Sequence, residues 1–124
     1  NNLAYILGVE LGRGTEALPF AERAVEIAPE NRGFLDTLGT VLIEAGQPDA
    51  AIEPLERALT LATTDTQRAP VLVHLARARL ETGNRPGAAE AANEARRIMD
   101  DIDEPDETTK AQLEDVLRAI DSAR

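Results

Sequence analysis

The sequence predicts an all-α fold built from repeated pairs of helices, and two observations carry this prediction. Apolar residues recur every three or four positions along almost the whole chain of 124 residues, which is the spacing of amphipathic helices. One glycine and two alanines also recur together, first after 34 residues and then after 37. These landmarks are Gly12, Gly46 and Gly83; Ala17, Ala51 and Ala88; and Ala24, Ala58 and Ala95. Shared spacings of this size indicate stacked structural repeats.

Each of the three copies divides into two helices. The copies span about residues 1–31, 32–65 and 66–101. Their helices are expected at residues 1–11, 15–28, 32–45, 48–62, 68–82 and 85–101. The three residues added before the third copy fall in the segment 63–70, where we expect a longer turn or a lengthened helix. A seventh helix is expected near residues 106–122, with Thr109 and Gln112 as its capping box.

The helices of the first two copies follow from their apolar stripes. In the first copy these residues are Leu3, Leu7 and Leu11, then Ala17, Phe20, Ala21, Ala24 and Ile27. Relative to the second copy, one residue is inserted near Leu11. In the second copy they are Leu35, Leu38, Leu42 and Ile43, then Ala51, Ile52, Leu55, Ala58 and Leu59. Gly46 is predicted to be a left-handed helix cap, and Pro54 is expected to bend its helix.

The last three helices are also predicted from their apolar stripes. The third copy has Leu72, Leu75 and Leu80, then Ala88, Ala91, Ala92, Ala95 and Ile98. The final helix has Leu113, Val116, Leu117 and Ile120, which we expect to cover the third copy. Glycine and alanine on the buried stripes let helices cross at roughly 8–9 Å, so Gly39, Ala51 and Ala58 are interpreted as spacers.

These positions resemble the tetratricopeptide repeat, whose pattern is W-x2-L-G-x2-Y, then A-x3-F, A and P. The second copy matches it at Leu35, Leu38, Gly39, Leu42, Ala51, Leu55 and Ala58. The resemblance implies a right-handed α-solenoid of about three helix pairs plus a C-terminal capping helix, in one domain over residues 1–124. It also implies a non-catalytic scaffold that holds a peptide or helix in a concave groove. Arginine and alanine richness adds the expectation of a bacterial source. The final capping helix and the helical start of the sequence add that of a C-terminal array in a larger protein.

Family resemblance places the groove on the first helix of each copy. The residues carried over by position are Tyr5, Val9, Asp36, Thr40, Ile43, Val73, Arg77 and Leu80. Arg77 is interpreted as a lone cation beside apolar neighbours, suited to a partner carboxylate. A pair between Arg77 and Asp36 is the competing interpretation, and an unused mixed surface is the alternative to any groove.

Composition excludes several other functions. The net charge of −10 argues against nucleic acid or an anionic membrane as partner, and no run of 18 apolar residues could span a membrane. There is no cysteine, and His74 is the only histidine, which we interpret as a helix-surface or partly buried residue. The acidic run from Asp100 to Glu107 lacks the glycine and spacing of a calcium loop, so it is interpreted as a solvated connector. We therefore expect no enzyme activity, cofactor or metal.

Two alternative functions stay open. One is self-assembly, in which the N-terminal end or the groove joins copies into a homo-oligomer. The other is an accessory domain of a larger enzyme whose catalytic part lies upstream. Because the sequence begins without methionine and already in a helical pattern, we expect a fragment, with any targeting signal upstream.

Overall fold

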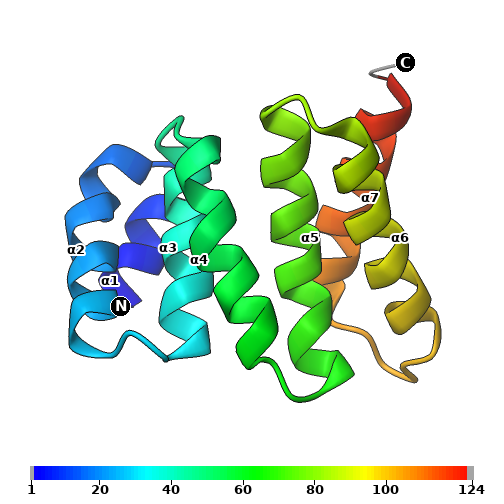
Figure 1. Ribbon diagram of the computed structural model, residues 1–124, viewed down its shortest axis with the longest axis horizontal. Helices are drawn as coiled ribbons and strands as arrows, with labels where there is room; N and C mark the ends of the chain where they lie inside the picture. The colour runs from blue at the N-terminus through cyan, green and yellow to red at the C-terminus, as the bar shows by residue number, and fades with distance from the viewer. Residues whose placement is uncertain (1, 123–124) are drawn as a thin grey trace. The chain divides into compact units, whose positions relative to one another are not determined.

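All regular elements of the computed structural model are helices over residues 2–122, which are the residues that it describes; the side chains of Asn2, Val9 and Glu10 lie outside the description. Figure 1 shows the helices in chain order. They are α1 (Asn2–Tyr5), the π-helix η1 (Ile6–Glu10), α2 (Gly14–Ile27), α3 (Arg32–Glu44), α4 (Pro48–Leu61), α5 (Asp65–Glu81), α6 (Arg85–Asp100) and α7 (Glu107–Ser122). The predicted all-α fold class is confirmed.

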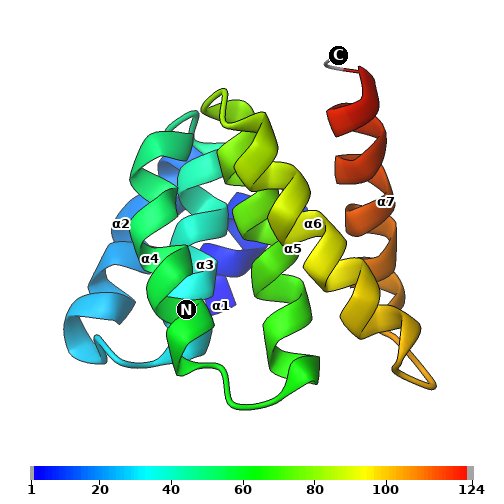
Figure 2. The same cartoon turned by 45° about the vertical axis from the view of Figure 1, so that its right-hand side comes forward.

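The chain forms two compact units, each with its own packing. The first unit covers residues 1–61 and the second covers residues 62–124. In the first unit α3 packs between α2 and α4, and both views in Figures 1 and 2 show these three helices side by side. In the second unit α5 and α6 pack together and α7 contacts both of them. The expectation of one continuous domain stays a prediction.

Most predicted helix boundaries agree with the structure within two residues, and the exception is α5. It begins at Asp65 instead of residue 68 because Thr64 acts as its N-cap, its side chain accepting a hydrogen bond from the Gln67 backbone N–H at 3.2 Å. The Gln67 side chain in turn accepts from the Thr63 backbone N–H at 2.9 Å. The extra residues of the third copy therefore lengthen a helix.

The residue inserted in the first copy is accommodated as a π-turn. A π-helix contains one more residue per hydrogen-bonded turn than an α-helix, so η1 holds the insertion without breaking the helix. The hydrogen bond after the end of the helix spans one residue more in the first copy than in the second. Arg13 N–H donates to the carbonyl of Leu7 at 2.6 Å, whereas in the second copy Gln47 N–H donates to the carbonyl of Leu42 at 2.8 Å. Before the insertion, corresponding residues of the first two copies are therefore 35 apart, and after it they are 34 apart.

Gly46 ends α3 in the left-handed conformation that the sequence predicted. Its φ is +80°, and its N–H donates to the Ile43 carbonyl at 3.0 Å, while the next N–H reaches back to the Leu42 carbonyl. This pair of bonds is a Schellman motif, which satisfies carbonyls that the helix leaves open. Gly12 and Gly83 share the conformation, with φ of +65° and +86°. All three landmark glycines thus stop the first helix of a copy.

Small residues set the separation of the helices, as expected. A Cβ built on Gly39 would lie 2.4 Å from Cγ of Leu55, so α3 and α4 touch without a side chain between them. The three alanines Ala51, Ala58 and Ala17 are fully buried. In the first unit, Ala4, Ala17, Ala21 and Val41 form one buried cluster. Close contact between helices therefore depends on the absence of larger side chains at these positions.

Replacing Gly39 with alanine should destabilise the first unit. The new methyl group would overlap the buried Leu55 side chain, and overpacking of this kind costs about 1–3 kcal/mol. Urea denaturation followed by circular dichroism measures the loss. Gly33→Ala is the control, because Gly33 is exposed in the first turn of α3, where alanine has the better helix propensity. Equal stability of the two variants would contradict the close contact.

Candidate functional site

Four of the seven proposed groove residues keep exposed area, and three are buried. Tyr5 is 41% exposed, and Asp36, Arg77 and Leu80 are partly exposed. Thr40, Ile43 and Val73 are only 5%, 3% and 1% exposed. Because these three side chains are buried, a partner bound to the groove would contact exposed residues next to them rather than the three side chains themselves. The side chain of Val9 lies outside the described residues.

The three buried side chains have identifiable physical reasons. The Thr40 hydroxyl donates to the Asp36 carbonyl one turn earlier at 2.9 Å, so its polar group is satisfied inside the protein. Ile43 lies in the last turns of α3, where the consecutive residues Val41, Leu42 and Ile43 are all buried, so this part of the helix is covered on several sides. Helix α5 packs against both α6 and α7, and its buried residues therefore cover most of its circumference, including Val73.

Arg77 is not a lone cation. Its Nε donates to Oε2 of Glu81 at 3.1 Å, an ion pair one turn along α5 in which the side chains are 40% and 43% exposed. Exposed pairs at this spacing contribute only about 0.3–0.5 kcal/mol, so an incoming carboxylate can compete for the guanidinium. The pair between Arg77 and Asp36 would join the two units and stays a prediction.

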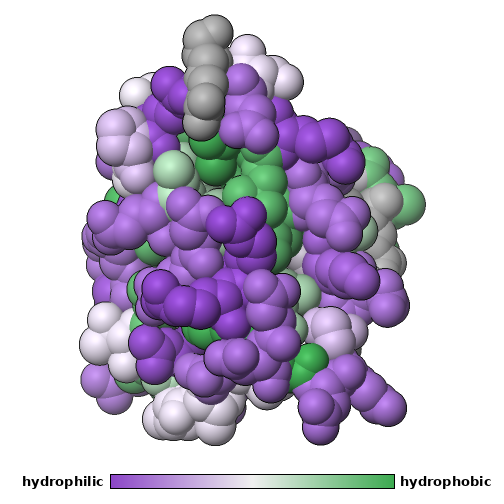
Figure 3. All heavy atoms as spheres, turned by 90° about the vertical axis from the view of Figure 1, so that its right-hand side faces the viewer, coloured by the Kyte–Doolittle hydropathy of each residue, from purple (hydrophilic) through white to green (hydrophobic). Residues whose placement is uncertain are grey.

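The second unit also has a hollow that the sequence did not reveal. A cavity of about 380 Å³ lies where α6, the acidic connector and α7 meet. Its lining residues are Arg96, Met99, Asp100, Pro105, Lys110, Leu113, Glu114 and Leu117. The space-filling view in Figure 3 shows apolar surface on this side of the molecule, set between hydrophilic side chains. Such a hollow combines an apolar lining with charged residues of both signs.

Asp106 caps α7, which corrects the predicted capping box of Thr109 and Gln112. The Asp106 carboxylate accepts hydrogen bonds from both the backbone N–H and the hydroxyl of Thr109, each at 2.9 Å. These hydrogen bonds lower the pKa of the Asp106 carboxyl below its ordinary value. The helix starts two residues before Thr109, since an aspartate in the connector is a strong N-cap. The acidic connector therefore contributes the residue that starts α7.

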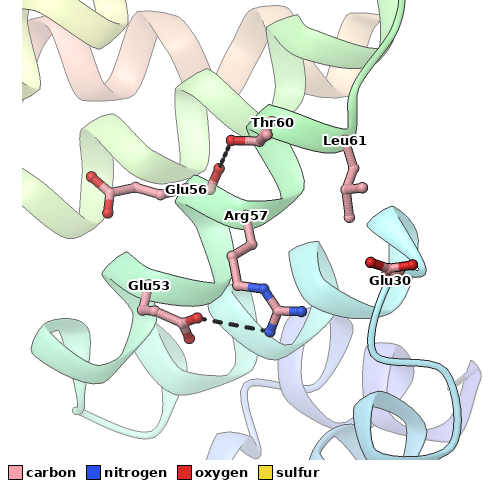
Figure 4. A pocket seen from close by; sticks show the side chains of 6 residues that line it. All are labelled: Glu30, Glu53, Glu56, Arg57, Thr60 and Leu61. Atoms are coloured by element: carbon pink, nitrogen blue, oxygen red, sulfur yellow. Dashed lines mark hydrogen bonds and ion pairs between the residues drawn. The ribbon is translucent and has the colours of Figure 1, made fainter.

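A second hollow lies in the first unit, between α4 and the turn that closes the first copy. It has a volume of about 280 Å³ and is lined by Glu30, Glu53, Glu56, Arg57, Thr60 and Leu61. Arg57 Nη2 donates to the Pro29 carbonyl at 2.8 Å, and Nη1 lies 3.7 Å from the Glu53 carboxylate. Figure 4 shows Arg57 extending from α4 toward the segment that carries Glu30, with Leu61 nearby. Arg57 thus joins the two copies of this unit.

The remaining candidates for chemistry have ordinary environments. His74 is half-buried on α5 and has an interaction partner within the protein. Among the residues that the structure describes, no group of three or more His, Cys, Asp or Glu side chains is placed to hold a metal ion. Within the same residues, no helix has both the length and the apolar character needed to cross a membrane.

Repeated helix pairs with glycine caps and alanine-lined contacts define a helical-repeat protein of the α-solenoid class. The structure is similar to the crystal structure of the Sgt2 TPR domain from Aspergillus fumigatus, with a TM-score of 0.69 and 22% sequence identity. The match covers 94% of this chain and 74% of that chain. The chain therefore has the fold of a tetratricopeptide repeat domain, as the sequence pattern predicted. No protein-family model matches the sequence, and neither does any curated protein.

Neutralising the α7 cap should lower stability at neutral pH but not in acid. Because the pKa of Asp106 is lower in the folded state, its charge stabilises the protein above the ordinary aspartate pKa, and this contribution is lost as pH falls through the lowered pKa. Asp106→Asn should therefore reduce the melting temperature at pH 7, and its difference from the parent protein should vanish in acid, once the pH lies below the lowered pKa of Asp106. Asp103→Asn, in the same connector but outside the cap, is the control. A pH-independent difference would contradict the assignment.

Removing Arg57 should weaken the contact between α4 and the closing turn of the first copy. Arg57→Ala deletes a hydrogen bond to a backbone carbonyl, which we expect to cost about 0.5–1.5 kcal/mol in urea denaturation. Arg23→Ala is the matched control because Arg23 occupies the corresponding position of the first copy and has no such acceptor among the described residues. Similar losses in both variants would show that the Pro29 contact contributes nothing.

Proposed function

We propose that this chain is a non-catalytic protein–protein interaction module that binds a peptide or helix along the first helices of its repeats. The observation that carries the proposal is the exposure of Tyr5, Asp36, Arg77 and Leu80 on these helices, while the residues around them are buried. The tetratricopeptide fold supports the proposal, because stacked helix pairs present extended surfaces for binding.

The exposed residues indicate what a partner must supply. In the second unit, Leu80 offers apolar surface within one turn of Arg77, whose guanidinium is held by a weak exposed pair with Glu81. An apolar side chain next to a carboxylate matches this arrangement. In the first unit, Tyr5 offers an aromatic ring and Asp36 a carboxylate, which suit an amphipathic segment with a donor group. The net charge of −10 makes nucleic acid an unsuitable partner.

Placement of the module at the C-terminus of a larger bacterial protein belongs to the same proposal. Self-assembly through the N-terminal end or the groove is the second candidate. The accessory-domain alternative has no observation in its favour in the part of the chain that the structure describes. Light scattering of the purified chain measures self-assembly directly, and a monomer over the whole concentration range would exclude it.

Arg77→Ala should weaken partner binding at least several-fold while barely changing stability. The Arg77 side chain is 40% exposed, and exposed ion pairs such as the one with Glu81 contribute little to stability, so we expect the substitution to act mainly on the complex. Partners captured by the immobilised chain would be purified, and their affinities measured by calorimetry. Arg118→Ala is the control, since Arg118 forms a comparable exposed pair with Asp115 on α7. Unchanged affinity for Arg77→Ala, with folding intact by circular dichroism, would remove the groove assignment.

A further inference from the structure

The hollow between α6 and α7 is lined by residues that the proposed groove does not use. Its volume is about 380 Å³, and its lining residues lie between Arg96 and Leu117. Helix α6, the acidic connector and α7 therefore supply its walls, and we call it the connector hollow. A cube of this volume has edges of about 7 Å, which is less than the roughly 10 Å diameter of an α-helix. The hollow therefore admits a small molecule but not another helix.

The floor of the connector hollow is apolar. Met99 and Leu113 are only 7% and 5% exposed, and the half-buried Pro105 and Leu117 extend the apolar surface outward. Met99 is the only methionine of the chain, and a methionine side chain adapts its shape to different apolar groups. The floor can therefore bury an apolar side chain of a ligand.

Four exposed charged side chains, two of each sign, form the rim of the connector hollow. The cations are Arg96 and Lys110, and the anions are Asp100 and Glu114. Helices α6 and α7 run in opposite directions on either side of the connector (Figure 2). Asp100 and Lys110 are therefore the two rim residues nearer the connector. Each level of the hollow thus has one cation and one anion on opposite helices.

These rim charges have no partner within the part of the chain that the structure describes. None of the four side chains forms an ion pair or a hydrogen bond there. On each helix the cation and the anion are four residues apart, a spacing at which ion pairs do form on α4 and α5. The rim therefore keeps charges of both signs available for a ligand.

We propose that the connector hollow binds a zwitterionic small molecule with an apolar side chain, the class to which apolar amino acids and short apolar peptides belong. The apolar side chain occupies the floor beside Met99 and Leu113. The ligand carboxylate faces a cation of the rim, and the ligand ammonium group faces an anion. This inference goes beyond the proposed function, because no residue of the groove lines the hollow.

The charge pattern of the rim favours a zwitterion over a ligand with one charge. A bound carboxylate without an ammonium group would pair with a cation but would also face the anion on the opposite helix. An amine without a carboxylate would meet the converse problem. The rim has no net charge, and the net charge of −10 on the chain repels anions. A ligand with both charges pairs with both signs and stays neutral as a whole.

The test compares three probes that share one apolar body. Leucyl-leucine is the zwitterion, N-acetyl-leucyl-leucine keeps only the carboxylate, and leucyl-leucine amide keeps only the amine. Met99 supplies the readout, because an isotopically labelled methyl group on a single methionine gives one NMR signal from the floor of the hollow. Leucyl-leucine should shift this signal saturably with one site. Each singly charged probe should bind about two- to fivefold more weakly, as expected for the loss of one exposed charge contact.

Substitutions in the chain locate the site. Arg96→Gln and Glu114→Gln should each weaken leucyl-leucine binding about two- to fivefold. Leu117→Asn removes apolar surface from the floor and should weaken binding at least about fivefold, with folding checked by circular dichroism. Arg97→Gln and Asp115→Asn are the matched controls, because each removes a charge next in sequence to a rim residue but outside the lining. Both controls should leave binding unchanged.

The outcomes separate the hollow from the groove. Absence of a saturable shift of the Met99 signal would overturn the proposal. Equal binding of the acetylated probe or of the amide would also overturn it, and would replace the zwitterion with an apolar carboxylate or an apolar amine. Unchanged affinity in all three lining variants would place the binding elsewhere. Arg77→Ala, which tests the proposed groove, should leave leucyl-leucine binding unchanged, so each proposal can fail without the other.

Discussion

The close approach of neighbouring helices is the constraint on which the rest of this structure depends. At three contacts a single added methyl group would overlap another helix. A Cβ on Gly8 would lie 2.6 Å from Val41, one on Gly39 would lie 2.4 Å from Leu55, and one on Gly14 would lie 2.5 Å from the backbone nitrogen of Ala45 at the end of α3. The chain has only one Tyr, two Phe and no Trp, so it cannot fill wide gaps between helices with aromatic rings. Contact at short distance through alanine and glycine is the alternative way to reach interior packing density.

Repeat spacing made the fold predictable because these contacts recur. The small residues and the terminating glycines must occur once per helix pair, and their shared spacing therefore marks helix number, order and boundaries. Even the residue inserted in the first copy was visible as a one-residue shift, although the sequence alone did not show that a π-turn accommodates it. The extra residues before α5 were visible too, and the Thr64 cap decided that they lengthen the helix.

The groove was harder to predict, because exposure depends on every neighbour of a helix. Val73 has the spacing of a surface residue, yet α5 contacts both α6 and α7 and is buried on most sides. Thr40 has the polar character expected of a groove residue. Its hydroxyl, however, donates a hydrogen bond to the Asp36 carbonyl, so the side chain can lie in the interior. The converse also occurs. Val41 is the counterpart of Ile6 in the next copy, 35 residues later, and it is fully buried, whereas Ile6 is 44% exposed. The position of a residue in the repeat predicts which side of its helix it occupies. The neighbouring helices determine whether that side is buried or exposed.

Three arginines connect segments of the chain through their guanidinium groups. Arg57, Arg79 and Arg85 each donate to a backbone carbonyl of another segment, those of Pro29, Gly87 and Ile120. A planar guanidinium has several donors in fixed directions, so it can satisfy a carbonyl and still reach solvent, which a single ammonium does less well. The surplus of acidic groups then remains largely at the surface, where the net charge of −10 opposes association between copies. Like charge on two copies therefore works against the apolar side chains that α1, η1 and α2 leave exposed in this chain.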